Sequence, residues 1–285
     1  MVEKVIGQRS GDDPQRSQDP QSQPPQEERR IGWVRWDGGW HGGRSAGIFA
    51  HRDRSPLGRG SLCIMTITPL GDQGVLATFD READAFRFAA AMRSAALPGV
   101  IDVVAAYFNV AIFYDLAQIR HAALVADLER LYARSRKHPL SDPAQSHVIP
   151  CCYALGPDLA RVAEFTHMSP ADVIRLHSET EYTVYAIGFC PGFPYLGYLP
   201  DRLCGVPRLP SPRLRVEPGS VGLTGRQTGV YPLERPGGWN LIGRTPLQLV
   251  DVATGYFPLR PGDRVRFAPI DETEFGRLHG VRLGA

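Results

Sequence analysis

The stretch from residue 182 to residue 251 limits the fold more than any other part of the chain. Its 70 residues hold 11 glycines and 10 prolines, the two residue types that helices tolerate least. Aromatic and branched apolar side chains stand between these helix breakers, so the stretch is not of low complexity. Short strands joined by tight turns fit both properties. The stretch therefore predicts a compact β-barrel or β-sandwich.

The sequence before this stretch alternates between helical and extended patterns. Two amphipathic helices are expected at residues 82–96 and 118–134. Four extended runs are expected at residues 75–79, 100–107, 110–114 and 147–153. Their order, β-α-β-β-α-β, is that of a ferredoxin-like domain. We therefore expect an α+β protein with a ferredoxin-like domain over residues 65–146 and a β-barrel domain over residues 147–280.

Two short helices are expected between these parts, at residues 157–164 and 169–177. The second has a clear start signal, because Ser169 is followed by Pro170 and, in the first turn, by Asp172. Serine is a common N-cap, and proline suits the first helical position.

Residues 1–60 differ from the rest of the chain. A polar run rich in Gln, Asp and Pro has little to bury and is expected to be disordered. Trp33, Trp36 and Trp40 follow among glycines and arginines, a mixture that can bind single-stranded nucleic acid. We favour a tail without a fold, or a mis-assigned start with the natural one at Met65.

Composition excludes several classes of function. The only lysines are Lys4 and Lys137, so the stretch 182–251 has no Schiff-base or P-loop lysine. Five cysteines without a C-x-x-C pair argue against a zinc site or a disulfide framework and favour the cytoplasm. No apolar run is long enough for a membrane span. We expect no metal, no nucleic-acid partner and no membrane association.

The stretch 182–251 offers no self-contained catalytic group. It holds seven arginines and four carboxylates but no histidine, so a Ser–His–acid triad would need His177 from outside it. Ser220 does not lie in a G-x-S-x-G motif and is expected to be a turn serine. Cys190 has no basic neighbour in sequence and is expected to be inert. The residues indicate either a site completed by another chain or a binding protein.

Several residues of the stretch are suited to binding an anion. Arg213 and Arg215 point to the same side of a strand, where they form either an anion site or a solvated face. The glycine-rich segment 222–229 can present backbone N–H groups to an anion. Arg244 adds a guanidinium at the end of a strand. Trp239 follows a Pro-Gly-Gly turn and fits a core position as well as an exposed platform.

Long motifs in these regions resemble one family. GFCPGFPYLGYLP, the run from PRLPSPRLRVEPGSVGLTGRQTGVY to GRTPLQLVD, and RPGDRVRF are similar to the family of the 5-oxoprolinase B subunit, also called the KipI or allophanate hydrolase subunit 1 family. The resemblance covers about residues 65–280. Relatives carry a Gly-Gly-Glu segment between a Cys-Tyr pair and Gly-Pro-Asp-Leu. Here only Ala154 and Leu155 separate Tyr153 from Gly156, and the acidic group is missing.

The resemblance implies a ferredoxin-like domain followed by a cyclophilin-like β-barrel. It implies that the chain is the B subunit of an enzyme that uses ATP to hydrolyse the lactam 5-oxo-L-proline to L-glutamate. Its partners would be an A subunit and a C subunit, the latter similar to the second allophanate hydrolase subunit. ATP is implied for the complex, not for this chain alone. Under this interpretation, the candidates to orient substrate carboxylate or phosphoryl groups are His177, Arg213, Arg215, Gln227, Tyr231 and Arg244, and no catalytic residue is assigned.

Two other functions stay open within the same family. The chain could inhibit a histidine kinase, as sporulation regulators do, a role that needs only a binding surface. It could also be a carboxyltransferase component that handles biotin in a urea carboxylase or allophanate hydrolase system. The interpretation as part of a 5-oxoprolinase is ranked first.

Deleting residues 1–60 is expected to leave folding and activity intact, because nothing in that segment resembles the family. The measurement compares the truncated and full-length chains by solubility, thermal unfolding and activity in the assembled enzyme. Loss of folding in the truncated chain would contradict the prediction.

Overall fold

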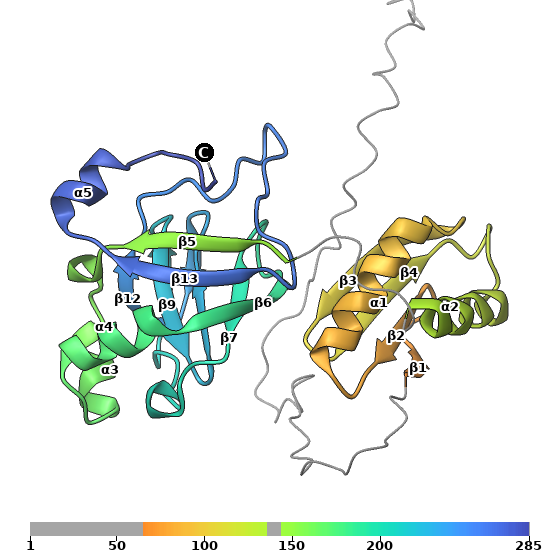
Figure 1. The fold of residues 1–285 in the computed structure, drawn as a ribbon, viewed down its shortest axis with the longest axis horizontal. Coiled ribbons are helices and arrows are strands. Elements are labelled where there is room, and N and C mark those ends of the chain that lie inside the picture. Colours follow the sequence, from red (N-terminus) through yellow and green to blue (C-terminus); the bar gives the residue numbers. More distant parts are fainter. Residues whose placement is uncertain (1–64, 136–143, 285) are drawn as a thin grey trace, which may run out of the picture. The chain divides into compact units, whose positions relative to one another are not determined.

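The structure is a computed structural model that describes residues 65–135 and 144–284 (Figure 1). The extension expected over residues 1–60 lies outside these described residues. Within them, the strands form a four-stranded sheet, a seven-stranded sheet and a two-stranded ribbon.

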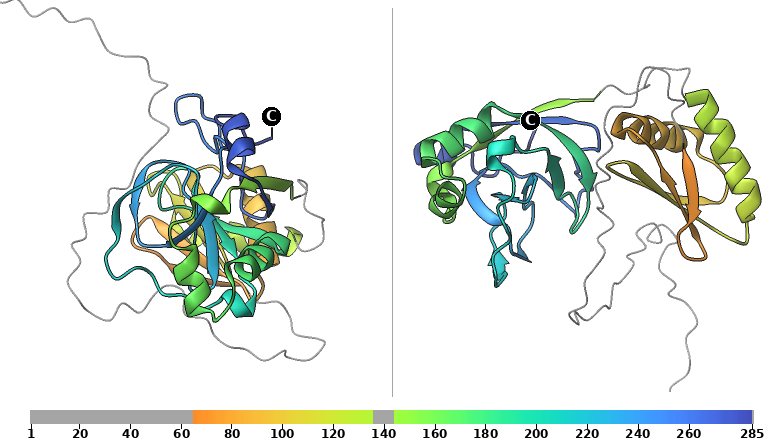
Figure 2. Two further views of the ribbon diagram at one scale, coloured as in Figure 1. Left: turned by 90° about the vertical axis from the view of Figure 1, so that its left-hand side faces the viewer. Right: turned by 90° about the horizontal axis from the view of Figure 1, so that it is seen from below.

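The first sheet is antiparallel, with strand order β1-β2-β4-β3. Its strands are β1 (Thr66–Pro69), β2 (Gly74–Thr78), β3 (Val100–Ala106) and β4 (Asn109–Tyr114). Helices α1 (Glu82–Ala95) and α2 (His121–Ser135) pack against it and against each other (Figures 1 and 2). Their apolar faces share one core with the sheet, which includes Phe88 and Met92 of α1 and Leu124 and Leu128 of α2. Both helices were expected from their periodicity.

The ferredoxin-like arrangement expected for this part is not confirmed. The extended run at residues 147–153 was expected to complete it, but strand β5 (Ser146–Cys151) joins the seven-stranded sheet instead. There β5 runs parallel to β13 (Arg264–Pro269), with Ser146 opposite Arg264 and Cys151 opposite Pro269. The edge of the first sheet beside β2 is formed by β1, which precedes α1 in the chain.

The seven-stranded sheet has the order β12-β9-β10-β7-β6-β13-β5. Its other strands are β6 (Glu181–Ile187), β7 (Pro194–Gly197), β9 (Ser220–Thr224), β10 (Gln227–Val230) and β12 (Asn240–Arg244). Cys152 and Arg244 exchange two backbone hydrogen bonds, of 2.8 and 3.0 Å. Because Cys152 directly follows β5 and Arg244 ends β12, these bonds join the two outer strands. The sheet is therefore a nearly closed barrel, one of the two arrangements that the glycine and proline density predicted.

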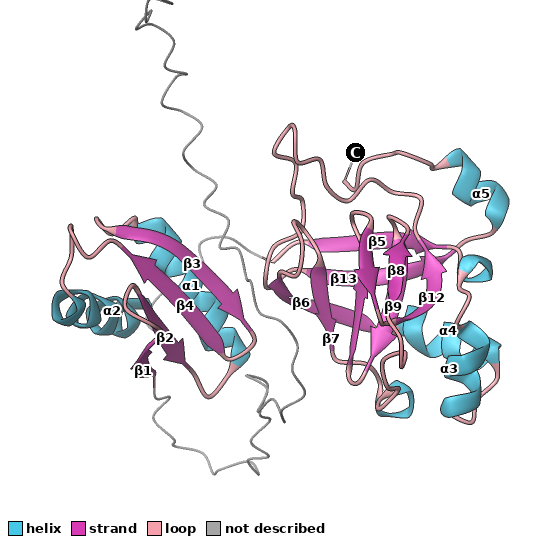
Figure 3. Ribbon diagram, turned by 180° about the vertical axis from the view of Figure 1, so that it is seen from behind, coloured by secondary structure: helices cyan, strands magenta, loops and turns pink. Residues whose placement is uncertain are grey.

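The remaining elements surround this barrel. The ribbon consists of β8 (Arg213–Val216) and β11 (Arg235–Gly237), and β8 is labelled in Figure 3. The short helices are η2 (Tyr153–Leu155), α3 (Leu159–Phe165), α4 (Pro170–Glu179), η3 (Asp201–Leu203) and α5 (Glu272–Arg277). Helix α3 contacts β12, and α4 contacts β13.

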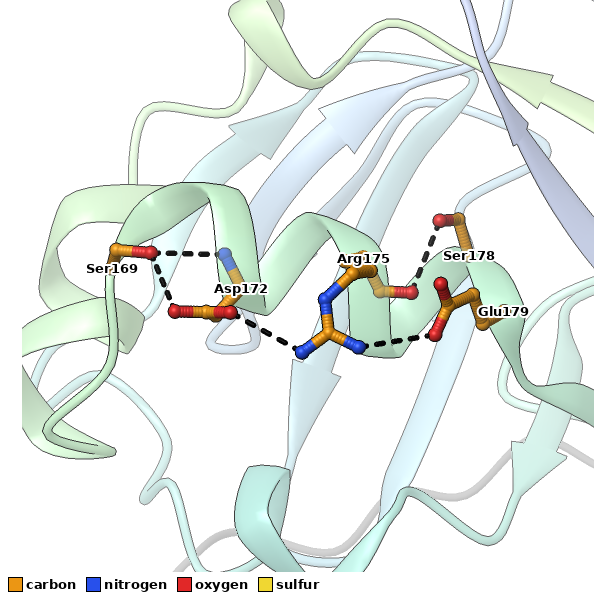
Figure 4. A network of polar contacts seen from close by, with 5 residues as sticks. All are labelled: Ser169, Asp172, Arg175, Ser178 and Glu179. Carbon is orange, nitrogen blue, oxygen red and sulfur yellow. Dashed lines mark hydrogen bonds and ion pairs between the residues drawn. The ribbon is translucent and has the colours of Figure 1, made fainter.

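Helix α4 begins as its sequence predicted. The hydroxyl of Ser169 accepts a hydrogen bond from the backbone N–H of Asp172 and donates one to its carboxylate (Figure 4). Arg175 then bridges Asp172 and Glu179, at 3.2 Å in each case. This polar outer side leaves the opposite side of α4, with Val173 and His177, to face the core.

His177 lies in the barrel core, where none of its surface reaches solvent. Its ring contacts Phe267 at a centroid distance of 4.6 Å. Its Nδ1 is 2.7 Å from the hydroxyl of Tyr153, and its Nε2 is 2.9 Å from the hydroxyl of Thr228. The Thr228 hydroxyl donates to the carbonyl of Gly222, so it accepts from His177 Nε2. Consequently Nδ1 accepts from Tyr153, and the neutral Nε2–H tautomer is fixed.

Burial lowers the pKa of His177 from 6.5 to about 3. Below about pH 6.5 the unfolded chain binds a proton at this histidine that the folded chain does not bind. The free energy of unfolding therefore decreases as the pH falls from about 6.5 toward 3, by about 1.4 kcal/mol per pH unit for this group.

Replacing His177 with glutamine (H177Q) is expected to lower the free energy of unfolding by about 1–3 kcal/mol at about pH 7.5, because two buried hydroxyls lose their partner. It is also expected to remove the contribution of about 1.4 kcal/mol per pH unit between about pH 6.5 and 4.5. Urea unfolding across this pH range measures both effects.

The control for this experiment is Tyr153→Phe, which removes one hydrogen bond and keeps the buried imidazole. This variant is expected to be less stable at every pH and to keep the wild-type pH dependence. Equal pH dependence in H177Q and the wild type would show that His177 is not a neutral buried group.

Candidate functional site

Arg213, one of the six residues expected to bind substrate, is held by the protein itself. Its Nη2 donates to Oδ1 of Asp158 at 2.7 Å. The other carboxylate oxygen of Asp158 accepts from the backbone N–H of Leu241, also at 2.7 Å. Asp158 is buried, so this pair ties the start of α3 to β8 and β12. Arg213 therefore has a structural contact through Nη2, and its expected anion-binding role stays a prediction.

Arg215 and Arg244 are brought together by Glu217. Arg215 contacts Glu217 at 3.1 Å and Glu234 at 2.8 Å. Arg244 lies 3.8 Å from Glu217 and donates its Nε–H to the carbonyl of Pro218. Both positive charges are thus matched by carboxylates. Arg213 and Arg215 have separate partners, so the two do not form the side-by-side fork that their spacing allowed.

Gln227 and the glycine-rich segment 222–229 form a hairpin. Thr224 is paired with Gln227 and Gly222 with Gly229, which places the segment in β9, β10 and the turn between them. The backbone N–H groups of these strands are used in sheet pairing, so the segment does not form the expected phosphate-type cradle. Gly229 is required for packing, because a Cβ there would lie 3.0 Å from Phe193 and 2.7 Å from the Pro194 carbonyl.

Tyr231 belongs to an aromatic cluster that is separate from the main barrel core. The cluster contains Cys190, Phe193, Val216, Tyr231, Trp239 and Leu241, with Tyr195 packed against it. The ring centroid of Phe193 lies 5.2 Å from Tyr231 and 5.4 Å from Trp239. Trp239 is buried, so it is a core residue and not an exposed platform. Burial also raises the pKa of Tyr231 to about 12, so its phenol stays protonated at neutral pH.

The candidate nucleophiles are not activated. Burial raises the pKa of Cys190 to about 11, which keeps its thiol protonated, as expected for an inert cysteine. Ser220 is buried at the start of β9, where its carbonyl accepts from the backbone of Tyr231. His177, the histidine nearest in sequence to the stretch 182–251, is neutral and enclosed in the core.

Residues that the sequence reasoning missed lie around the aromatic cluster. Phe189 is 57% exposed, although its ring is 5.4 Å from Phe193 and 6.1 Å from Tyr231. Arg208 and Arg235 are exposed beside the same cluster. The signal for them was the motif GFCPGFPY together with the arginine surplus of the stretch, but neither indicates which side chains meet.

Two further properties bear on the kind of site. Within residues 65–135 and 144–284, no group of three or more His, Cys, Asp or Glu side chains is arranged to hold a metal ion. In the same residues, no helix combines the length and the apolar character needed to cross a membrane.

Comparison with known proteins gives consistent results. The family described as carboxyltransferase domain, subdomain C and D, matches residues 65–256. The B subunit of 5-oxoprolinase from Bacillus subtilis (strain 168) is 36% identical over 228 residues, which are 73% of this chain and 94% of that protein. The B subunit of 5-oxoprolinase from Escherichia coli O157:H7 is 45% identical over 186 residues, which are 64% of this chain and 84% of that protein.

Solved structures show the same likeness. TTHA0988 has a TM-score of 0.61 and 38% identity over 70% of this chain, which spans 40% of the TTHA0988 chain. The urea amidolyase of K. lactis has a TM-score of 0.58 over 77% of this chain and 16% of its own, but only 16% identity, so it shows the fold alone. From the family match over most of the sequence and the relatives matched over most of their length, the chain belongs to the carboxyltransferase domain, subdomain C and D, family that includes the 5-oxoprolinase B subunits.

Proposed function

We propose that this protein is the B subunit of an ATP-dependent 5-oxoprolinase, which hydrolyses 5-oxo-L-proline to L-glutamate together with the A and C subunits. The observation that carries the proposal is the identity of 36–45% to proteins named as 5-oxoprolinase B subunits, over 84–97% of their lengths. Similarity this high over nearly whole chains supports a shared role more strongly than a shared fold does.

The chemistry of the described residues supports one part of an enzyme and not a complete hydrolase. Lactam hydrolysis needs a nucleophile, a group that moves protons and donors for the developing oxyanion. In this barrel His177 is enclosed in the core, the Cys190 thiol is protonated, and Arg213 and Arg244 form contacts within the fold. The proposed enzyme therefore needs reacting groups from its A or C subunit, while this chain supplies binding groups.

The glycine-rich segment 222–229 does not fit a triphosphate, because its strand N–H groups are used in the hairpin of β9 and β10. We therefore propose that the nucleotide acts at the level of the complex. Biotin enters only under the alternative carboxyltransferase role. The fold shared with urea amidolyase is compatible with that role but carries no specificity at 16% identity.

Co-expression of this chain with the A and C subunits of the same organism is expected to give glutamate release from 5-oxo-L-proline that depends on ATP. Amino-acid analysis of the products measures the release. Omitting this chain or ATP is expected to abolish it.

The alternatives predict different results in the same preparation. No glutamate from the complete set, with a working reference 5-oxoprolinase alongside, would refute the proposal. Recovery of a histidine kinase without the C subunit in a pull-down, or biotin-dependent carboxylation of urea, would favour one of the other two family roles.

A further inference from the structure

The aromatic cluster reaches the surface at Phe189. Its inner rings, Phe193, Tyr231 and Trp239, are buried. Phe189 contacts the rings of Phe193 and Tyr231, and more than half of it is exposed. Phe189 has a φ of 67°, in the left-handed region that residues with a side chain rarely adopt. A strained backbone that holds an apolar ring toward solvent is a feature associated with ligand-binding positions.

Two arginines border this exposed aromatic surface. The backbone N–H of Leu209 donates to the carbonyl of Gly238 at 2.8 Å, which holds the backbone at Arg208 close to the segment that carries Trp239. Arg235 stands two residues before Gly237, whose Cβ, if present, would lie 2.4 Å from the Tyr231 hydroxyl. The close approach at Gly237 thus brings the start of β11, and Arg235 with it, against the cluster.

The electrostatics agree with this placement. Burial raises the pKa of Tyr195 and Tyr231, and the positive charge of Arg208 lowers it in part. The charge of Arg235 likewise lowers in part the pKa of Cys190, which burial raises. Each guanidinium therefore lies within electrostatic range of the cluster.

Neither guanidinium is neutralised by a carboxylate among the described residues. Arg235 donates to the backbone carbonyl of Glu234, and Arg208 has no ion pair in residues 65–135 and 144–284. In the same part of the chain, the hydroxyl of Tyr195 has no hydrogen-bond partner, although the side chain is only partly exposed. By contrast, Arg213 and Arg215 have carboxylate partners.

These groups define the chemistry of a ligand. Two guanidinium forks suit a carboxylate, and an exposed aromatic ring suits a compact body with an apolar face. A tyrosine hydroxyl with an unused donor and acceptor suits a neutral amide. A small cyclic amide that carries a carboxylate has all three features.

We propose that Phe189, Tyr195, Arg208 and Arg235 form the site where this chain binds the carboxylate end of the lactam substrate. The inference rests on the proposed function and adds the location and the recognition groups. The arginines hold the carboxylate, Phe189 packs on the ring, and Tyr195 contacts the amide, so these residues bind substrate and leave the reacting groups to another chain of the enzyme.

The test uses the complex assembled with the A and C subunits and the variant R208Q/R235Q. Its KM for 5-oxo-L-proline is expected to rise at least about tenfold, because charge-assisted hydrogen bonds to the carboxylate are lost. Its kcat is expected to change by less than about threefold, since the removed contacts bind ground state and transition state alike. The matched control is R266Q, which changes an exposed arginine on β13 and is expected to keep the wild-type KM.

A second substrate and a second variant separate recognition from general damage. The carboxamide of 5-oxo-L-proline lacks the charge, so wild-type enzyme is expected to turn it over with a KM at least about tenfold higher, and R208Q/R235Q is expected to lose this preference. Phe189→Ala is expected to raise the KM for both compounds. Thermal unfolding of R208Q/R235Q should match the wild type, because neither arginine has a carboxylate partner to lose.

The outcomes distinguish the two proposals. If the wild-type complex is active and R208Q/R235Q keeps both its KM and its preference for the carboxylate, the site is wrong and the proposed function stands. A wild-type complex without 5-oxoprolinase activity refutes the proposed function, and this inference with it.

Discussion

Two backbone hydrogen bonds between Cys152 and Arg244 hold the barrel closed, and much of the surrounding sequence is adapted to them. They connect the outer strands β5 and β12, which would otherwise leave two unpaired edges exposed. The approach is so close that a Cβ on Gly243 would lie 2.5 Å from the sulfur of Cys151. A Cβ on Gly156 would lie 2.1 Å from the backbone of Ile242. Larger residues at either glycine would separate the two edges.

The same closure explains why the most conspicuous charged residues are structural. Asp158 follows Gly156 at the seam, where it accepts from the backbone of Leu241 and from Arg213. Arg244 contributes its backbone to the seam and its guanidinium to the carbonyl of Pro218. A buried carboxylate requires a partner, since an uncompensated charge in the core costs several kcal/mol. Arg213 therefore neutralises the buried carboxylate of Asp158 and stabilises the fold.

Local features of the fold were predictable, and long-range pairings were not. The cap at Ser169 and the periodicity of α1 and α2 depend on residues within a few positions of one another. The pairing of β5 with β13 depends on residues more than a hundred positions apart, such as Gln145 and Asp263, which are linked by a hydrogen bond. No periodicity indicates which of two sheets such a strand will join, so the run at residues 147–153 was counted in the ferredoxin-like order although it pairs in the seven-stranded sheet.

In the candidate site, too, contacts between residues far apart in the chain could not be predicted from the sequence. A sequence reveals that arginines are present but not which of them meets a carboxylate, because Asp158 lies 55 positions from Arg213. It also could not reveal that His177 is fully enclosed, since a histidine on an amphipathic helix can face either way. Tyr231 packs in the aromatic cluster beside Phe189 and Tyr195, which come from a loop and a strand about forty positions away.

The stretch 182–251 carries three more arginines than carboxylates, and Arg208 and Arg235 are two of its arginines for which the described residues provide no carboxylate. Within the protein, each paired arginine is neutralised by a carboxylate. Glu217 and Glu234 neutralise Arg215 and Arg244 in this way. An exposed arginine without a partner costs the fold little, because water solvates it. It keeps N–H donors available in a rigid fork, and its charge does not vary across the physiological pH range. A surplus held beside a strained, exposed aromatic residue is therefore better explained by a ligand than by stability, and a carboxylate from outside the chain is the group that would balance it.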